Sequence, residues 1–166
     1  MEKLIDFLYT GGYNDDMDTA ENQPAQEASI FQLHARMFAI GDRYDIPILM
    51  EVANEKFSAR CRNDWQHRDF LAAVQVVYET TPPTMQRLRE TASAACRSRM
   101  AELLMDEDTR ALCDSVLDEV PAFAKDLLYV FVKSPMAGYC TECRAHRAME
   151  PLQVRCKACR KGRSSW

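Results

Sequence analysis

Residues 30–57 read IFQLHARMFAIGDRYDIPILMEVANEKF, and this stretch contains two runs of helical periodicity separated by a proline. In the first run, apolar residues recur every three or four positions, at Ile30, Leu33, Met37, Ile40 and Tyr44. This spacing predicts a helix with one apolar face, and Ser29 is a suitable N-cap. Because proline fits the first turn of a helix, Asp45-Ile46-Pro47 is predicted to end this helix and begin a second. The second run continues at Ile48, Leu49, Val52, Ala53 and Phe57. The two runs therefore predict a tight helical hairpin.

Similar patterns on both sides of this hairpin predict further helices. A short helix over residues 2–9 is expected to stop at Gly11-Gly12, and residues 14–28 are polar and acidic, which is typical of an exposed loop. After the two helices of the hairpin, Asn63-Asp64 is predicted to cap the next helix, which ends at Thr80-Thr81-Pro82-Pro83. One long helix from Met85 to Leu104, another after Asp106-Glu107-Asp108 and a last one from Pro121 complete residues 1–132. The predicted fold class is therefore mainly α.

Composition indicates a folded chain and argues against membrane insertion or secretion. The 166 residues are 47% hydrophobic and 28% charged, which argues against a disordered polypeptide. The longest apolar stretch, residues 127–132, is too short to cross a bilayer. The N-terminal residues show no signal-peptide pattern. We therefore expect an intracellular protein of the nucleus or cytoplasm, whose seven cysteines are thiols or metal ligands.

Four of the seven cysteines form two closely spaced pairs near the C-terminus. Cys140-x-x-Cys143 and Cys156-x-x-Cys159 are separated by twelve residues, enough for a short hairpin, and residues 152–155 alternate as a short strand. A two-residue gap lets one tight turn present both thiolates to a single tetrahedral ion. We therefore predict a structural Zn²⁺ site with Cys140, Cys143, Cys156 and Cys159 as ligands, in a small zinc-ribbon-like module.

Other interpretations of these cysteines remain open at the sequence level. The same four residues could hold iron, form disulfides or remain free thiols, and His146 could replace one thiolate. A catalytic zinc is disfavoured, because four thiolates leave no position for water.

The chain is also divided by charge. Residues 1–132 carry 13 Lys/Arg and 23 Asp/Glu, a net charge of −10, whereas residues 133–166 carry 8 Lys/Arg and 2 Asp/Glu, a net of +6. The basic side chains of the cysteine module are Arg144, Arg147, Arg155, Lys157, Arg160, Lys161 and Arg163. They could contact nucleic-acid phosphates or an acidic protein surface. A solubilising tail, or docking onto the acidic helical part, is the favoured interpretation because no aromatic-interleaved binding face is evident.

The remaining reactive residue types do not form a catalytic pattern. Cys61, Cys96 and Cys113 are scattered on predicted helices and are expected to be packing residues. His34 and His67 each occur alone on a helix, and are expected to be surface or satisfied core histidines. No glycine-rich phosphate loop or nucleophile with a paired acid is found. We therefore expect a non-enzymatic protein without catalytic residues, organic cofactor, small-molecule substrate or membrane partner.

Three segments resemble the BTB/POZ family. Residues 4–13, LIDFLYTGGY, are similar to its "LYTG" helix, residues 33–49, LHARMFAIGDRYDIPIL, to the helical hairpin that follows, and residues 51–57, EVANEKF, to its last helix. The match covers about residues 2–60. Within the family, the sequence is most similar in character to filamentous-fungal BTB proteins, and this similarity includes the segments near Phe70 and Tyr78. The family's first strand, dimerising helix and small sheet precede the "LYTG" helix, so the chain resembles a BTB fold without its N-terminal half.

This resemblance implies a domain organisation and a function. We expect a partial BTB/POZ-like domain over residues 1–60, a helical extension over 61–133 and the zinc-binding tail over 134–166. The resemblance implies a protein–protein interaction module, such as a scaffold or a substrate adaptor for a cullin-type ubiquitin ligase, with another BTB protein or a cullin as partner. The alternative is a zinc-ribbon protein that binds nucleic acid, or acts in transcription, through its basic tail.

Overall fold

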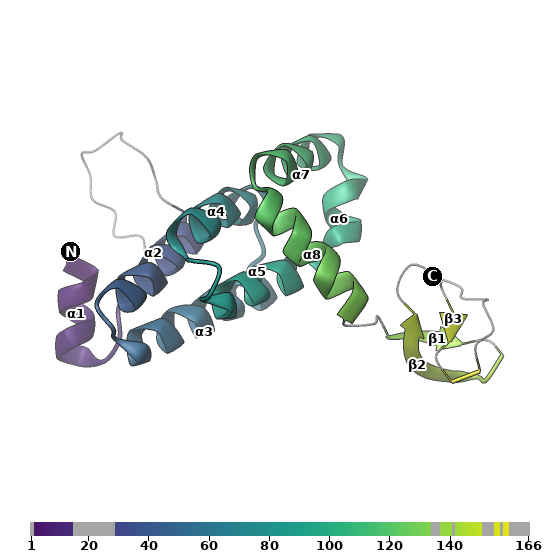
Figure 1. Cartoon of the computed structure of the whole chain (residues 1–166), viewed down its shortest axis with the longest axis horizontal. Coiled ribbons are helices and arrows are strands. Elements are labelled where there is room, and N and C mark those ends of the chain that lie inside the picture. The colour runs from purple at the N-terminus through teal and green to yellow at the C-terminus, as the bar shows by residue number, and fades with distance from the viewer. Residues whose placement is uncertain are drawn as a thin grey trace.

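The computed structural model describes residues 2–14, 29–133, 137–140, 142–150, 155–156 and 158–159. Most of these residues lie in helices, which confirms the mainly α fold class (Figure 1). The helices are α1 (Glu2–Thr10), α2 (Ile30–Arg43), α3 (Pro47–Asn63), α4 (His67–Thr80), α5 (Gln86–Ser98), α6 (Met100–Met105), α7 (Glu107–Glu119) and α8 (Pro121–Lys133). The strands β1 (Ala137–Cys140), β2 (Ala145–Glu150) and β3 (Arg155–Cys156) follow beyond the C-terminal end of α8.

The predicted hairpin is formed by α2 and α3. Ser29 caps α2, because its hydroxyl accepts a hydrogen bond from the Gln32 N–H at 3.3 Å. Pro47 occupies the first turn of α3, as expected. The two helices approach closely at the buried Gly41, where an added Cβ would lie 2.7 Å from Cγ of Met50 and 3.0 Å from its backbone nitrogen. The absence of a side chain at this position therefore permits the tight hairpin.

An aromatic cluster joins this hairpin to α4. The ring centroids of Phe31 and Phe57 are 5.3 Å apart, and that of Phe70 is 5.8 Å from Phe31. All three phenylalanines are fully buried. Trp65 stacks on Phe70 at 4.3 Å in the segment between α3 and α4. Aromatic rings bury large apolar areas, so this cluster is the centre of the N-terminal half of the core.

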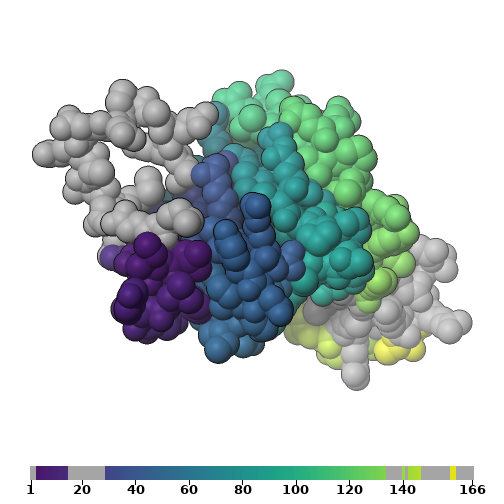
Figure 2. Space-filling model, turned by 60° about the vertical axis from the view of Figure 1, so that its left-hand side comes forward, coloured from purple at the N-terminus to yellow at the C-terminus, as the bar shows by residue number. Residues whose placement is uncertain are grey.

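Helices α1 to α8 together form the helical body of the protein, and its second half consists of α5 to α8. In this half, α8 packs on α5 and α7 packs on α4 (Figure 1). Its buried apolar residues include Leu88, Leu103 and Phe123, and they are continuous with the aromatic cluster of the first half. Figure 2 shows the N-terminal side of this body, where α1 lies beside the hairpin. The residues that the sequence divided into a BTB-like domain and an extension therefore share one hydrophobic core.

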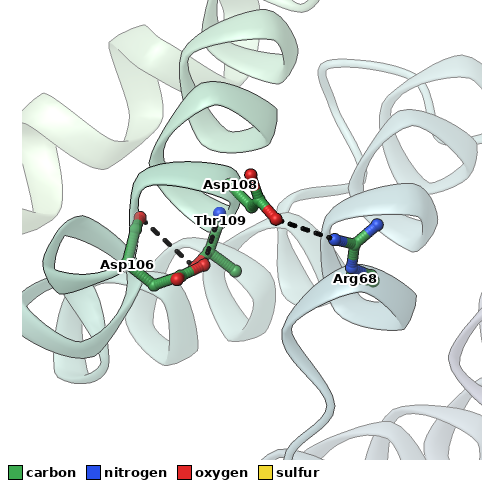
Figure 3. Close-up of polar contacts among 4 residues, drawn as sticks. All are labelled: Arg68, Asp106, Asp108 and Thr109. Atoms are coloured by element: carbon green, nitrogen blue, oxygen red, sulfur yellow. Dashed lines mark hydrogen bonds and ion pairs between the residues drawn. The ribbon is translucent and has the colours of Figure 1, made fainter.

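The N-terminus of α7 is fixed by its acidic residues (Figure 3). One carboxylate oxygen of Asp106 accepts hydrogen bonds from the Thr109 N–H at 2.9 Å and from the Thr109 hydroxyl at 2.6 Å. Asp108 faces Arg68 of α4 at 3.8 Å, with both side chains largely exposed. The acidic run was predicted to begin a helix, and Asp106 confirms this prediction as its N-cap.

Two boundary predictions are wrong. Asn63-Asp64 does not cap the helix that follows the hairpin, because that helix, α4, begins at His67. Instead, α3 continues through Asn63 and ends at Asp64, whose carboxylate forms an ion pair with Arg60 at 2.7 Å. The long helix predicted from Met85 to Leu104 is two helices. It breaks at Arg99, whose N–H donates to the carbonyls of both Ala95 and Cys96.

Several residues that were assigned to apolar faces are exposed, among them Tyr44, which is 56% exposed at the end of α2. Ile48 is 67% exposed and Leu104 is 44% exposed, because the buried faces of their helices are formed by Leu49 and Leu103 instead. No helix in the described ranges is long and apolar enough to cross a bilayer.

Candidate metal centre

Three thiols from the two CxxC pairs converge in the C-terminal module. The Sγ atoms of Cys140, Cys143 and Cys159 all lie within 4.8 Å of one another. Those of Cys140 and Cys159 are 3.5 Å apart, well beyond the length of a disulfide bond. Cys140 is fully buried, and Cys159 packs against it. Residues nineteen positions apart in the sequence therefore share one small cluster of sulfur atoms.

The sheet accounts for this convergence. Strands β1 and β2 form an antiparallel hairpin in which Cys140 is paired with Ala145, so the turn between them contains Cys143. Arg144 completes this turn with a φ of 48°, in the left-handed region. Strand β3 joins the other edge of β2 through the pair Met149 and Cys156, and Cys159 follows in the next turn. A hairpin between the two CxxC turns therefore brings them together, as the sequence predicted.

The geometry of the cluster suits a tetrahedral thiolate site. Four sulfur ligands at about 2.3 Å from zinc are about 3.8 Å from one another. The 3.5 Å separation of Cys140 and Cys159 is close to this value, and the 4.8 Å limit leaves only a small adjustment for the third sulfur. No acidic or imidazole group joins these three sulfur atoms among the residues described.

Hydrogen bonding also favours the form of the thiol that binds metal. The backbone N–H of Cys143 donates to the Cys140 sulfur and is the main cause that lowers the pKa of this thiol to about 7. Hydrogen bonds from the Cys143 and Cys159 side chains and from the Glu142 backbone act in the same direction. Because the thiolate is the metal ligand, the turn prepares Cys140 to coordinate a cation.

The structure brings together three of the four predicted ligands. The side chain of the fourth, Cys156, lies outside the part of the chain whose side chains are described, although its backbone is placed in β3. His146, the alternative ligand, is exposed on β2, where its backbone is paired with Tyr139. Of the basic residues in the tail, Arg144 has a described side chain, which is exposed. The others lie outside the described side chains.

The remaining cysteines are buried in the helical body, as expected. Burial raises the pKa of the Cys61 thiol to about 12. Cys96 of α5 and Cys113 of α7 are both fully buried and hydrogen-bonded to each other, which raises the pKa of Cys96. The same hydrogen bond lowers the pKa of Cys113. The burial of all three side chains agrees with the packing role predicted for them. The contact between Cys96 and Cys113 was not predicted, because no local spacing links residues on two separate helices.

Comparison of the chain with protein-family models, curated proteins and solved structures finds no match. The resemblance to BTB/POZ domains therefore rests on the three sequence segments alone. The fold and the site define a mainly helical protein with a three-stranded C-terminal module that contains a cluster of thiols.

Proposed function

We propose that residues 134–166 form a structural zinc module in which Cys140, Cys143, Cys156 and Cys159 hold one Zn²⁺. The observation that carries this proposal is the convergence of three Sγ atoms within 4.8 Å. Zinc accepts four thiolates in a closed tetrahedral shell, and the CxxC spacing supplies the fourth thiolate at Cys156. The ion would supply a rigid cross-link between the two turns and no catalytic chemistry.

The energetics of the module support a structural role for the ion. Among its described residues, the buried cluster consists of Cys140 with Cys159 packed against it, so hydrophobic burial contributes little. A structural zinc ion contributes on the order of 10–16 kcal/mol in small peptides. Metal binding would therefore be the main source of folding free energy for this module.

Metal content tests this proposal. The purified full-length chain should contain about one zinc per molecule, measured by plasma mass spectrometry after gel filtration. Cys140→Ser should lose the metal because it removes a ligand. Cys61→Ser is the matched control, since Cys61 lies in the helical body, and it should retain the zinc. A folded module without zinc in the wild-type chain would contradict the proposal.

We further propose that the helical body is a non-enzymatic protein–protein interaction module of BTB/POZ type, of the kind found in filamentous fungi. The sequence resemblance supports this, together with apolar side chains that α1 leaves in solvent. Ile5, Leu8 and Tyr9 are 51%, 62% and 87% exposed, and they belong to the segment that resembles the "LYTG" motif. Apolar side chains grouped on one exposed helix are typical of interaction surfaces. The partner class that the resemblance suggests is another BTB protein or a cullin, with a scaffold or substrate-adaptor role.

Affinity capture with quantitative mass spectrometry tests this role. The wild-type chain should recover a protein partner that Leu8→Glu/Tyr9→Glu no longer recovers. The matched control is Met105→Glu, because Met105 is 86% exposed on α6 and lies outside the segment of resemblance. Capture that is equal for all three proteins, or that recovers no specific partner, would contradict the interaction role of α1.

Nucleic-acid binding by the tail is the second candidate, and the charge of residues 133–166 favours it. Eight Lys/Arg against two Asp/Glu would release counterions on contact with phosphates, so binding should weaken steeply with salt. The zinc-loaded chain and its Lys157→Gln/Arg160→Gln/Lys161→Gln variant can be compared by filter binding at low salt. Retention at background level for both proteins would exclude this function.

A further inference from the structure

A groove between α5 and α8 combines apolar walls with several cations. Its volume is about 630 Å³, which is within the usual range for small-molecule sites. The side chains that define its character are Arg89, Glu90, Lys125, Asp126, Tyr129 and Lys133. None of these residues belongs to the cysteine module, so the groove is separate from the candidate metal centre.

Arg89 is the most unusual of these residues because it is a buried cation. It is 8% exposed, and buried arginines are ordinarily paired with an acid. Its Nε donates to the Thr81 hydroxyl at 3.0 Å, and its Nη2 donates to the carbonyls of Tyr78 and Thr81 at the end of α4. No carboxylate in the described ranges lies within 4.0 Å of Arg89, and its Nη1 makes no hydrogen bond there. Nη1 of this guanidinium therefore has no acceptor within the described ranges, and Arg89 lines the groove.

Two further cations lie on the α8 side of the groove. The Nζ atoms of Lys125 and Lys133 are each 5.7 Å from the centroid of the Tyr129 ring. The ring is one helical turn from each lysine, so its two neighbours bring positive charge to the same region. Neither ammonium has an ion-pair partner among the described residues. No carboxylate in the described part of the chain therefore forms an ion pair with either lysine.

The acidic residues of the groove offset these cations only in part. Asp126 accepts a hydrogen bond from the buried Tyr78 hydroxyl at 2.8 Å, so one of its carboxylate oxygens is already engaged. Burial, together with this hydrogen bond, raises the pKa of Tyr78 and keeps its hydroxyl protonated as the donor. Glu90 is exposed on α5. Three cations and two carboxylates leave the groove with an excess of one positive charge.

We propose that the groove between α5 and α8 binds a small organic anion that carries a carboxylate on an apolar group. The carboxylate accepts hydrogen bonds from Nη1 of Arg89, and a guanidinium recognises carboxylates with high directionality. The ammoniums of Lys125 and Lys133 add attraction at the rim. The apolar group packs on the Tyr129 ring and on the short side chains of Ala94 and Ala122, which also line the groove. The anion is a bound ligand and undergoes no reaction there.

Binding of benzoate to the zinc-loaded, full-length chain tests this proposal by ¹H–¹⁵N NMR titration. Benzoate should shift the Arg89 side-chain Nε–H signal and the backbone signals around Tyr129 in a saturable manner. Benzyl alcohol, which has the same ring without the charge, should produce no saturable shift of these signals. The Lys125→Gln/Lys133→Gln variant should bind benzoate about fivefold more weakly, because two partly solvated ion contacts are lost.

Arg87→Gln is the matched control, since Arg87 is on the same helix but lines another groove, with Ser58 and Cys61. Its affinity for benzoate should equal that of the wild type. Equal responses to benzoate and benzyl alcohol, no saturable shift at the groove, or equal losses in the lysine variant and the Arg87 control would each overturn the proposal. Arg89 need not be replaced, so these outcomes do not depend on a variant that fails to fold.

Discussion

The hydroxyl of Tyr13 and Nδ1 of His34 form a buried hydrogen bond of 2.8 Å. Tyr13 is 4% exposed and His34 is fully buried on α2. The Nζ atom of Lys56 from α3 lies 5.1 Å from the centroid of the Tyr13 ring. The segment after α1 is thereby attached to both helices of the hairpin. This contact places His34 in the core, with its Nδ1 hydrogen-bonded, and not on the surface.

Removal of the Tyr13 hydroxyl should destabilise the helical body. We expect Tyr13→Phe to lower the free energy of unfolding by about 1–3 kcal/mol, because a buried ring nitrogen of His34 loses its hydrogen-bond partner. Urea denaturation followed by circular dichroism measures this change. Tyr9→Phe is the matched control, because Tyr9 is 87% exposed, and it should leave stability unchanged. Equal stabilities for the two variants would refute the structural role of the Tyr13 hydroxyl.

Substitution of Gly41 should destabilise the hairpin, although alanine is the better helix former. A glycine-to-alanine change in a helix ordinarily gains up to about 1 kcal/mol. At Gly41, however, the new Cβ would lie 3.0 Å from the backbone nitrogen of Met50, which cannot move without displacing α3. We therefore expect Gly41→Ala to lower stability by about 1–3 kcal/mol.

The control for this prediction is Gly12→Ala. An added Cβ at Gly12 meets no atom within 4 Å, so stability should change by less than about 0.5 kcal/mol. A gain in thermal stability for Gly41→Ala would mean that the two helices do not approach as closely as described.

The hydrogen bond from Tyr78 to Asp126 should couple α4 to α8. A double-mutant cycle with Tyr78→Phe and Asp126→Ala should give a coupling energy of about 1 kcal/mol or more, because the acceptor is charged and part-buried. The comparison pair is Arg68 and Asp108, whose side chains are 71% and 83% exposed at a separation of 3.8 Å. Their coupling energy should be near zero. A reversed order of the two coupling energies would contradict the assigned packing of α8.

Stability should depend on the ionisation of Asp106. Hydrogen bonds from the Thr109 hydroxyl and N–H hold the pKa of the Asp106 carboxyl below its usual value. A lowered pKa in the folded state means that the unfolded chain takes up the proton first. This contribution to stability is therefore complete above the usual pKa and is lost as the pH falls through the lowered one.

Asp106→Asn should reduce stability at pH 7, with a difference from the wild type that shrinks as the pH falls below about 4. Urea midpoints measured between pH 7 and pH 3.5 would show this convergence. Asp118→Asn, at an exposed position of the same helix, serves as the control and should not reproduce it. A difference that grows towards acid pH would have the wrong sign.

Periodicity and caps predicted most of the helical body. Ser29, Pro47 and Pro121 begin their helices as expected, because caps and proline act through local backbone geometry. One error arose where two local roles compete for the same residue. Asn63 and Asp64 have good capping side chains, but Asp64 ends α3, with its carboxylate paired to Arg60 one turn earlier. Sequence periodicity does not show whether Asp64 caps the following helix or ends the preceding one.

The candidate metal centre was predicted more completely than the polar contacts of the core. The CxxC spacing is local chemistry, so it identified Cys140, Cys143 and Cys159 before their convergence was known. The hydrogen bonds of Tyr13 with His34, of Cys96 with Cys113 and of Arg89 with Thr81 each join two separate segments of the chain. No spacing in one sequence indicates such pairs, because each depends on how the helices pack.

The central proposal is that four cysteines hold one zinc ion. The most direct test is X-ray absorption at the zinc edge of the purified chain. We expect four sulfur neighbours at about 2.3 Å and no nitrogen neighbour. This result would place Cys156, and not His146, in the shell with the three converging thiols. A shell with a nitrogen neighbour near 2.0 Å would contradict the four-cysteine assignment, and a chain without bound zinc would contradict the metal centre itself.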